Sequence, residues 1–403
     1  MVKHERCLLT LLIAAAVGCG STGGSTDDTV ADAAEVDRDV APTSTCDGSG
    51  ERCVDDWGVD ICPTDTGYPG DGLSICQPAA GTGMLFHYGP RDYDDPEEIE
   101  KYMLPAGGED ENCVFVETTN DKPVYLNSYH ARMRPGSHHL IVTVVDSLDP
   151  GVELGEPVSC NQSGAIGSRW LLASQDPQLD IGTTGGDFDG APAQPGDPDY
   201  AAGTKIPPRS ILRIDMHYLN PTDQPILREA WLYVNEVAEE DVEVSVDMIT
   251  FLQSSINVPP NTTGTTTGIG SCSAPTERYV GLVTGHFHEN GTRFTIWATR
   301  DGKREKVYET FDWESPGNGV YMDRADNPPL GDPGAPWGAD SGYLRLAPGD
   351  SLDWQCEFDN PTDEVVGRGD QGRDQMCNLF GFYYPSDGDV WTCGCVGELC
   401  AGI

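Results

Sequence analysis

The eight histidines of this 403-residue chain are its clearest candidates for chemistry, because five of them fall in three short clusters. His138 and His139 are adjacent in PGSHHLIVTVVD, His217 lies in RIDMHYLNP, and His286 and His288 are two residues apart in GLVTGHFHENG. Imidazole nitrogens bind copper, zinc, nickel and iron. A single histidine is usually structural, but three clusters in a histidine-poor chain argue against coincidence and predict a transition-metal site.

Strand geometry decides which of these side chains can share an ion. Side chains two residues apart on a strand point to the same face, so His286 and His288 can reach one ion together. Neighbouring side chains diverge on a regular strand. His138 and His139 can therefore share an ion only where the backbone bends, and the preceding Pro135-Gly136 favours an irregular start to their strand.

The elements that would position these histidines have the pattern of β-strands. Short β-branched runs bounded by Pro, Gly or Asp recur from about residue 85, and several alternate apolar with polar residues. The predicted strands are 139–146, 211–220, 229–237, 242–253, 278–288, 293–300, 306–314 and 343–360. Residues 94–104 form the one predicted short helix, and the Gly/Pro/Asp-rich stretch 174–208 predicts a long surface loop. We therefore expect an all-β fold of two antiparallel, jelly-roll-like β-sandwiches in tandem, with a boundary within 236–246.

The composition limits the class of partner. The chain has 66 Asp and Glu against 24 Lys and Arg, a formal net charge of −42. Such a surface repels a phosphate backbone and anionic lipid, which excludes nucleic acid as the expected partner. The simplest role of this acidity is solubility, and 38% hydrophobic residues are enough for a folded core.

The N-terminus has the pattern of an exported lipoprotein. A basic start and a short apolar run end in AVGC, which resembles a bacterial lipobox whose cysteine, here Cys19, becomes lipidated. We expect a signal peptide over 1–18, a flexible acidic tether over 19–45 and a small cysteine-rich segment over 46–84. An ordinary secretory signal is the alternative. The expected location is outside the cytoplasm, with the lipid anchor as the only contact with a membrane.

The cysteines agree with that location. Of the fourteen, Cys7 falls in the signal peptide and Cys19 carries the lipid, which leaves twelve, an even number. Disulfides persist in oxidising compartments, and the sequence has no C-x-x-C pair of the kind that binds zinc. We expect the twelve to form disulfides. The composition and the spacing of the cysteines do not determine which cysteines pair.

The order of the motifs resembles that of the copper type II ascorbate-dependent monooxygenases, the family of peptidylglycine α-hydroxylating monooxygenase and dopamine β-monooxygenase. The shared elements are a histidine pair, then HY, then H-x-H, then D-x-M-C in DQMCNLFGFYYP (374–385), which follows GDSLDWQCEFDNPT (349–362). DQMCNL with its aromatic continuation is the most specific of these elements. HHL and MHYLNP support the match, HFH adds less, and the resemblance covers roughly residues 85–395.

This resemblance implies two copper ions per chain, one in each sandwich, that face each other across a solvent-filled cleft. The implied reaction is hydroxylation of an activated C–H bond of a small organic substrate, with O₂ and with ascorbate or another electron donor. A soft thioether ligand favours Cu(I), the state that must meet O₂. The implied ligands are His138, His139 and His217 for the electron-supplying copper in 85–240, and His286, His288 and Met376 for the O₂ and substrate copper in 241–403.

The resemblance also implies disulfides and a substrate contact. The implied pairs are Cys356 with Cys377, Cys113 with Cys160, and Cys272 with one of Cys393, Cys395 or Cys400. The pairing of Cys46, Cys53, Cys62 and Cys76 stays open, and Asn378 is the implied contact with substrate. In the peptide-amidating branch an arginine precedes the H-x-H pair, whereas residues 283–285 here read VTG. A glycine-extended peptide is therefore not the expected substrate.

Two other classes of protein remain as alternatives. One is a copper-binding or copper-sequestering lipoprotein on the same fold without catalysis, and the other is a structural β-sandwich lipoprotein. Retention of all six implied ligands favours the enzyme over both. His87 is expected to be structural, and His130 is expected to support a ligand or lie on the surface.

Overall fold

The computed structural model describes residues 45–46, 53–54, 59–62, 64–79, 81–160, 169–182, 202–242, 244–314, 316–317, 319–320, 344–369, 372–386, 388, 390–397 and 399–402. These residues belong to one compact unit of the chain. The predicted signal peptide, Cys19 and all but the last residue of the predicted tether lie outside them.

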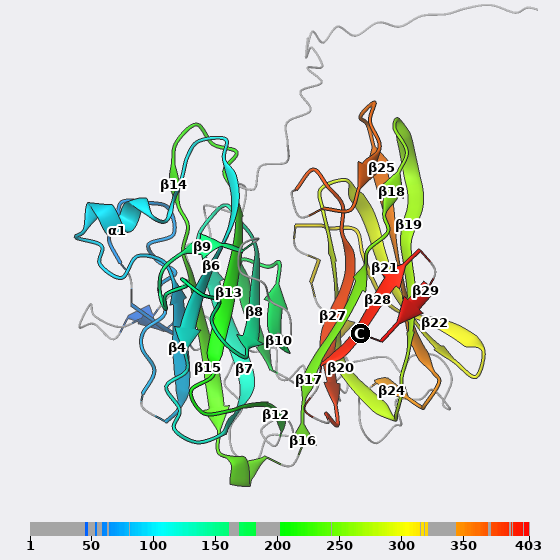
Figure 1. The fold of residues 1–403 in the computed structure, drawn as a ribbon, viewed down its shortest axis with the longest axis horizontal. Helices are drawn as coiled ribbons and strands as arrows, with labels where there is room; N and C mark the ends of the chain where they lie inside the picture. The colour runs from blue at the N-terminus through cyan, green and yellow to red at the C-terminus, as the bar shows by residue number, and fades with distance from the viewer. Residues whose placement is uncertain are drawn as a thin grey trace, which may run out of the picture. The chain divides into compact units, whose positions relative to one another are not determined.

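The described residues are almost entirely strands, and the prediction of an all-β fold is confirmed (Figure 1). The elements up to residue 245 are β1 (Thr45–Cys46), β2 (Cys53–Val54), β3 (Asp60–Ile61), β4 (Gly83–Tyr88), α1 (Pro96–Glu100), β5 (Met103–Leu104), β6 (Glu109–Glu117), β7 (Val124–Met133), β8 (Ser137–Val145), β9 (Val158–Ser159), β10 (Arg169–Ser174), β11 (Gln178–Gly182), β12 (Ala202–Ile206), β13 (Ile211–Leu219), β14 (Ile226–Leu227), β15 (Ala230–Val237), the 3₁₀ helix Glu239–Asp241 and β16 (Val244–Ser245).

The remaining elements are also strands. They are β17 (Asp247–Gln253), β18 (Asn257–Val258), β19 (Thr262–Ser273), β20 (Arg278–Phe287), β21 (Gly291–Arg300), β22 (Lys303–Thr310), β23 (Gly319–Val320), β24 (Leu344–Leu346), β25 (Ser351–Asn360), β26 (Val366–Gly367), β27 (Cys377–Tyr384), β28 (Trp391–Val396) and β29 (Leu399–Ala401).

Strand pairing divides these elements into two groups that share no ladder among the described strands. In the first group, the larger sheets have the orders β10-β8-β13-β6-β9 and β16-β12-β7-β15-β4, with β11 paired to β7. In the second, they are β23-β20-β27-β17-β28-β29, with β24 paired to β20, and β19-β25-β21-β22. Most ladders are antiparallel, and the change from one group to the other falls between β16 and β17.

The two groups share a turn that appears as a repeat in the sequence. The tetrapeptide NPTD occurs at 220–223 and again at 360–363. The Nδ2 of Asn220 donates to the carbonyls of Leu104 and Gln224, and Asn360 makes the equivalent bonds to Val258 and Glu364. The same amide thus closes the same turn against a short two-stranded sheet in each group, which is a structural repeat that we did not expect.

The hydrophobic core explains why the two groups are in contact. Phe380 and Phe382 of β27 are buried in the same cluster as the first group's core. Phe382 stacks on Tyr129 with 6.0 Å between ring centroids, and Phe380 stacks on Trp170 with 5.3 Å. Burial of these rings brings the faces that carry the histidines together.

Two predicted elements differ from the structure. The helix is a single turn, α1, which begins after Asp95; the Asp95 side chain accepts a hydrogen bond from the Glu97 amide and so caps it. The predicted loop 174–208 contains strand β11 near its start and β12 near its end, and both pair with β7. Pairing with a neighbouring strand overrides the Gly and Pro content there.

Five disulfides occur among the described residues. They are Cys62–Cys76, Cys113–Cys160, Cys272–Cys393, Cys356–Cys377 and Cys395–Cys400. The second and fourth are pairs that the resemblance implied, and the third takes one of the three implied alternatives. These disulfides are compatible with a location outside the cytoplasm. In the described ranges, no helix has the length and apolar character needed to cross a membrane.

Candidate metal centre

His138 and His139 lie at a β-bulge, which solves the problem of adjacent side chains that diverge. In the ladder between β8 and β13, His217 is opposite His139, and the next partner pair is Tyr218 with Ser137. His138 is therefore the extra residue on β8, where the strand bends. The bend places the His138 and His139 ring centroids only 5.3 Å apart, with His217 5.1 Å from each.

His286 and His288 come from the other group of sheets. His286 is on β20 opposite Asn378 of β27, and His288 follows the strand end. Their ring centroids are 5.2 Å apart and their planes are perpendicular, as expected for side chains on one face.

The structure brings all five histidines into one cluster. The His138 ring lies 5.7 Å from His286 and 5.2 Å from His288, and the His139 ring lies 5.4 Å from His286. The resemblance implied two groups separated by a solvent-filled cleft, whereas here rings of the two groups are in contact. The shared aromatic core described above is the physical reason for this difference.

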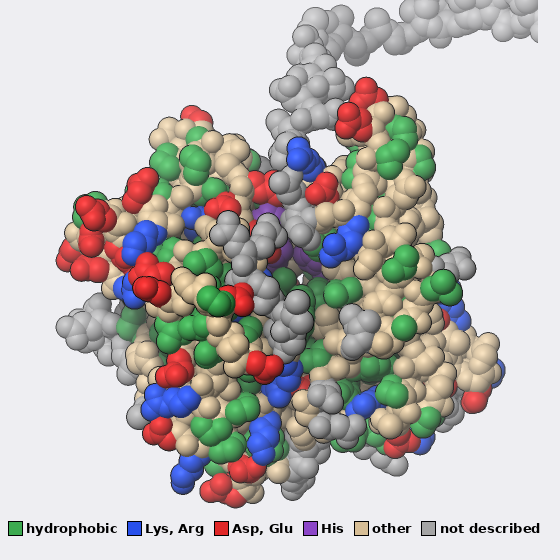
Figure 2. Space-filling model, in the orientation of Figure 1, with side chains coloured by type: hydrophobic (Ala, Val, Ile, Leu, Met, Phe, Trp, Pro, Cys, Tyr) green, Lys and Arg blue, Asp and Glu red, His purple; other side chains and the backbone are tan. Residues whose placement is uncertain are grey.

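Within the cluster, two sets of three rings have the spacing of a metal site. Donor atoms of His138, His139 and His217 lie within 4.8 Å of one another, and so do those of His138, His286 and His288. None of these five residues is more than 7% exposed. Figure 2 shows histidine side chains recessed in the face of the molecule, with acidic side chains near them.

Hydrogen bonds hold three of the rings in a defined orientation. The Nε2–H of His217 donates to Glu109 Oε1 at 2.9 Å, which leaves Nδ1 with the lone pair. The Glu109 carboxylate also accepts from the Gly372 amide at 2.8 Å, and the hydrogen bond from His217 holds the Glu109 pKa below its usual range. Glu109 thus connects β6 to the segment that leads to Met376.

His286 and His288 are oriented in the same way through Nδ1. Gln175 donates its amide N–H groups to the carbonyls of Phe287 and Trp313, so its Oε1 is the atom that accepts from His286 Nδ1 at 2.9 Å. The Nδ1–H of His288 donates to the Asp374 carbonyl at 3.0 Å. With Nδ1 protonated, the lone pair of each ring is on Nε2, the atom through which such a ring would bind a metal ion.

Several ring nitrogens of the cluster are buried without a hydrogen bond in the described part of the chain. They are His138 Nε2, both nitrogens of His139, and His217 Nδ1. Burial, followed by repulsion from the neighbouring imidazoles, holds the pKa of His138, His139 and His286 well below 6.5. Neutral, unpaired imidazoles in an apolar interior are costly unless they bind something.

A cavity of about 250 Å³ opens beside this cluster. His139, His286 and Met376 line it, together with Asn378 and a largely apolar wall that includes Trp170 and Phe380. The cavity therefore offers a small organic molecule an apolar surface next to candidate metal ligands.

Met376 is tied to the second group of sheets through the residues that follow it. Cys377, the next residue, is bonded to Cys356 of β25, and Asn378 Nδ2 lies 3.6 Å from Met376 Sδ. Met376 and His286 line the same cavity, and the disulfide at Cys377 anchors the segment that carries Met376.

The donor set fits copper. Unpaired neutral imidazoles and one thioether are the ligands that copper accepts in both oxidation states, and thioethers favour Cu(I). Metal–nitrogen bonds of about 2 Å can draw together donors that start within 4.8 Å of one another. The Glu109 carboxylate accepts a hydrogen bond from His217, and Glu111 Oε1 lies 3.7 Å from His139 Nε2.

His87 and His130 lie in separate networks. His87 Nε2 is 2.7 Å from Glu229 Oε1, and His130 Nδ1 is 2.7 Å from Asp180 Oδ1. The Ser128 hydroxyl lies 3.5 Å from His130 Nε2, but these side chains are almost fully buried and do not border the cavity. His87 is partly exposed and has a structural partner, as expected. His130 is buried rather than on the surface, and its partner Asp180 does not belong to the histidine cluster, so the expectation for His130 was wrong.

Glu109, Gln175 and Asp374 hold rings of the cluster, and sequence reasoning did not identify them in this position. Glu109 and Gln175 are 108 and 111 residues away from the rings they hold, so no local spacing reveals them. Asp374 belongs to the DQMC motif, but it accepts from His288 through its backbone carbonyl, so its residue type gave no signal for this contact.

Comparisons with known proteins add little to this description. No family model and no curated protein matches the chain. Among solved structures, the infectious bursal disease virus Gt strain matches with 12% identity and a TM-score of 0.15, over 78% of this chain and 76% of that chain. The VP2 subviral particle of the same virus matches with 11% identity and a TM-score of 0.15, over 79% of this chain and 76% of that chain. Similarity at this level supports no statement about function.

Proposed function

We propose that this protein is a copper-dependent monooxygenase that hydroxylates an activated C–H bond of a small organic substrate. The co-substrates are O₂ and a reductant such as ascorbate. The observation that carries the proposal is a cluster of five buried histidines, three with ring nitrogens that lack a hydrogen bond, beside a cavity that His139, His286 and Met376 line. The resemblance in the HH, HY, H-x-H and DQMCNL motifs supports the same assignment.

Two copper ions per chain follow from dividing the ligands. A neutral imidazole has one lone pair, so His138 serves one ion at a time although it belongs to both sets of three. The division that uses each ligand once gives His138, His139 and His217 to one ion, and His286, His288 and Met376 to the other. Copper supplies one-electron redox chemistry and activation of O₂ when bound.

The residues of the chain supply position and exclusion of water. Glu109, Gln175 and the Asp374 carbonyl fix the rings, which lowers the cost of assembling the site. The apolar wall around Trp170 and Phe380 holds the substrate beside His286 and keeps bulk water away from the reacting C–H bond. Asn378 donates toward Met376 Sδ from the cavity wall and is placed to contact the substrate as well.

The location proposed with this function is the outer side of a bacterial membrane. A signal peptide over 1–18 and lipidation at Cys19 would export the chain and anchor it through an acidic tether. The five disulfides support export, and anchoring rests on the AVGC motif alone.

A second candidate is copper binding without catalysis. The burial of the cluster favours it, since His288 is fully buried and His138 and His139 are each 4% exposed. Such burial suits retention of an ion. The cavity beside His286 and Met376 favours the enzyme, because a storage site needs no room for an organic molecule.

Copper loading followed by ascorbate-dependent O₂ uptake separates these candidates. The mature protein is loaded, freed of excess copper and assayed against benzylic and aliphatic substrates. Two bound coppers with substrate-dependent uptake support the enzyme, and two bound coppers with no uptake for any substrate favour the binding protein. His286→Ala removes a proposed ligand, and His87→Gln is the matched control because His87 bonds only to Glu229 in a separate network.

A further inference from the structure

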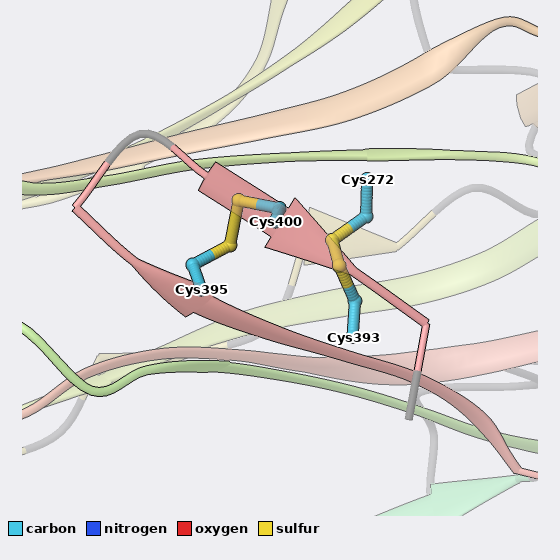
Figure 3. Close-up of side chains that lie close together, drawn as sticks. All are labelled: Cys272, Cys393, Cys395 and Cys400. Atoms are coloured by element: carbon cyan, nitrogen blue, oxygen red, sulfur yellow. A yellow bond between two sulfur atoms is a disulfide. The ribbon is translucent and has the colours of Figure 1, made fainter.

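The cysteines at the C-terminal hairpin form a second cluster, separate from the histidines. Cys272 of β19 is bonded to Cys393 of β28, and Cys395 of β28 is bonded to Cys400 of β29. All four Sγ atoms lie within 4.8 Å of one another. Figure 3 shows the two disulfides side by side.

The two disulfides differ in accessibility. Cys272 and Cys393 are each 3% exposed, and their bond joins the two large sheets of the second group through β19 and β28. The Cys395–Cys400 bond closes a short hairpin at the edge of a sheet, and Cys400 is partly exposed there. The adjacent pair Val396 and Leu399, on the opposite face of the hairpin, is 67% and 82% exposed, as expected for an edge of a sheet.

This arrangement suits thiol–disulfide exchange in a fixed order. A thiolate from solution can reach Cys400 of the outer disulfide, Cys395–Cys400. It cannot reach the buried inner disulfide, Cys272–Cys393. Cys395, once released, is already next to that inner disulfide, and an intramolecular attack has a high effective concentration. The outer disulfide therefore gives access to the inner one.

We propose that these four cysteines are a thiol-exchange site that accepts a low-molecular-weight thiol at Cys400. The incoming thiolate bonds to Cys400 Sγ, the Cys395–Cys400 bond breaks, and its electron pair stays on Cys395. The Cys395 thiolate then bonds to Cys272 and releases Cys393 as a thiolate. Cys393 bonds to Cys400 and expels the original thiolate, so the thiol is a catalyst and no net oxidation or reduction occurs.

The exchange preserves the connection between the two sheets. In the starting pairing Cys272 is bonded to Cys393, and in the exchanged pairing it is bonded to Cys395, which lies on the same strand β28. The second group of sheets therefore stays cross-linked throughout. The site can carry a thiol on Cys400 without loss of the disulfide that joins β19 to β28.

Disulfide mapping under native conditions tests the proposal. The oxidised full-length protein is incubated with catalytic glutathione, quenched with acid, alkylated and mapped by mass spectrometry, with fragmentation at Gly394 to distinguish Cys393 from Cys395. We expect a glutathione adduct on Cys400, and Cys272–Cys395 together with Cys393–Cys400, while tryptophan fluorescence stays native. Cys356–Cys377 is the internal control and should not exchange, because both of its cysteines are fully buried.

A variant provides the second arm. In Cys395→Ala/Cys400→Ala, reduction of the inner disulfide under native conditions should slow by about ten-fold or more, because the internal nucleophile is gone. Native pairs alone in the wild-type map, or exchanged pairs that appear only as fluorescence reports unfolding, would overturn the proposal. An unchanged reduction rate in a folded variant would overturn it as well, and the wild-type map decides the question if the variant does not fold.

Discussion

At the scale of single residues, the site depends on side chains that do not bind the metal themselves. Glu109 holds the His217 ring through Nε2 and is itself held by the Gly372 amide. A ring fixed in this way presents Nδ1 without having to lose rotational freedom when the ion binds. The contribution of Glu109 to copper affinity should therefore be large for a residue that never touches the ion.

Glu109→Gln tests this contribution. The amide oxygen can still accept from His217, but the negative charge that makes the ring a stronger donor is lost. We expect copper affinity to fall by about ten-fold or more. Competition with a chromophoric Cu(I) chelator measures the affinity. Glu117→Gln is the control, because Glu117 belongs to the same strand and its exposed carboxylate lies 3.6 Å from Arg209. Equal copper affinities for the two variants would contradict the role of Glu109.

Met376→Ile tests the thioether. Isoleucine keeps the apolar volume but removes the soft sulfur that favours Cu(I). Turnover should be lost while copper stays bound at His138, His139 and His217, as measured by O₂ uptake and by metal content. Met84→Ile, at a buried methionine of β4, controls for the change of shape. Full activity of the Met376 variant would remove Met376 from its assigned role.

At the scale of elements, the parts of the site that depend on local geometry were predictable. The i, i+2 spacing predicted that His286 and His288 share a face, and the Pro135-Gly136 pair pointed to an irregularity before His138. The bulge itself lies two residues after Gly136, at His138, and depends on the register between β8 and β13. Register is set by the whole sheet, which is why the sequence could not locate the bulge.

The contact between the two groups of histidines was not predictable. It depends on the packing of Phe380 and Phe382 against Trp170 and Tyr129 of the other group. Local sequence patterns do not predict contacts between residues that are more than one hundred positions apart. The contact between Gln175 and His286 was not predicted for the same reason, since Gln175 follows β10 in the first group and orients a ring of the second.

The paired asparagines give a prediction about stability at this scale. Asn360 is fully buried and its amide donates to the carbonyls of Val258, Pro259 and Glu364. Asn360→Ala leaves these carbonyls without their donor and should lower the free energy of unfolding by about 3 kcal/mol. Urea unfolding measures the change. The exposed neighbour Asp363→Ala is the control, and a loss below about 1 kcal/mol at Asn360 would mean that the turn does not depend on this amide.

At the scale of the whole molecule, the acidic surface and the buried histidines have separate effects. The net charge of −42 keeps nucleic acid and anionic lipid away, and it raises the local concentration of cations such as copper. The histidines join β8 and β13 of one group of sheets to β20 of the other. In the proposed division of ligands each copper would be bound within one group of sheets, at sites whose histidine rings are in contact across the two groups.

Copper that binds the folded protein at these sites should raise its thermal stability. Binding to the folded state alone stabilises by mass action, about 2.7 kcal/mol when free copper is one hundred times its dissociation constant. Calorimetry of the apo and copper-loaded protein measures the shift in Tm. The shift should be lost in a His139→Ala/His288→Ala variant and kept in His87→Gln. A shift that survives in the double variant would place the bound copper elsewhere.

The most direct test of the account is the origin of the oxygen atom in the product. The copper-loaded protein is given ascorbate, isotopically labelled dioxygen and a substrate found by O₂ uptake, and the product is analysed by mass spectrometry. The account predicts one labelled oxygen atom per product molecule, and no product from His286→Ala or from the copper-free protein. Bound copper with no labelled product for any substrate, or product that carries oxygen from water, would contradict it.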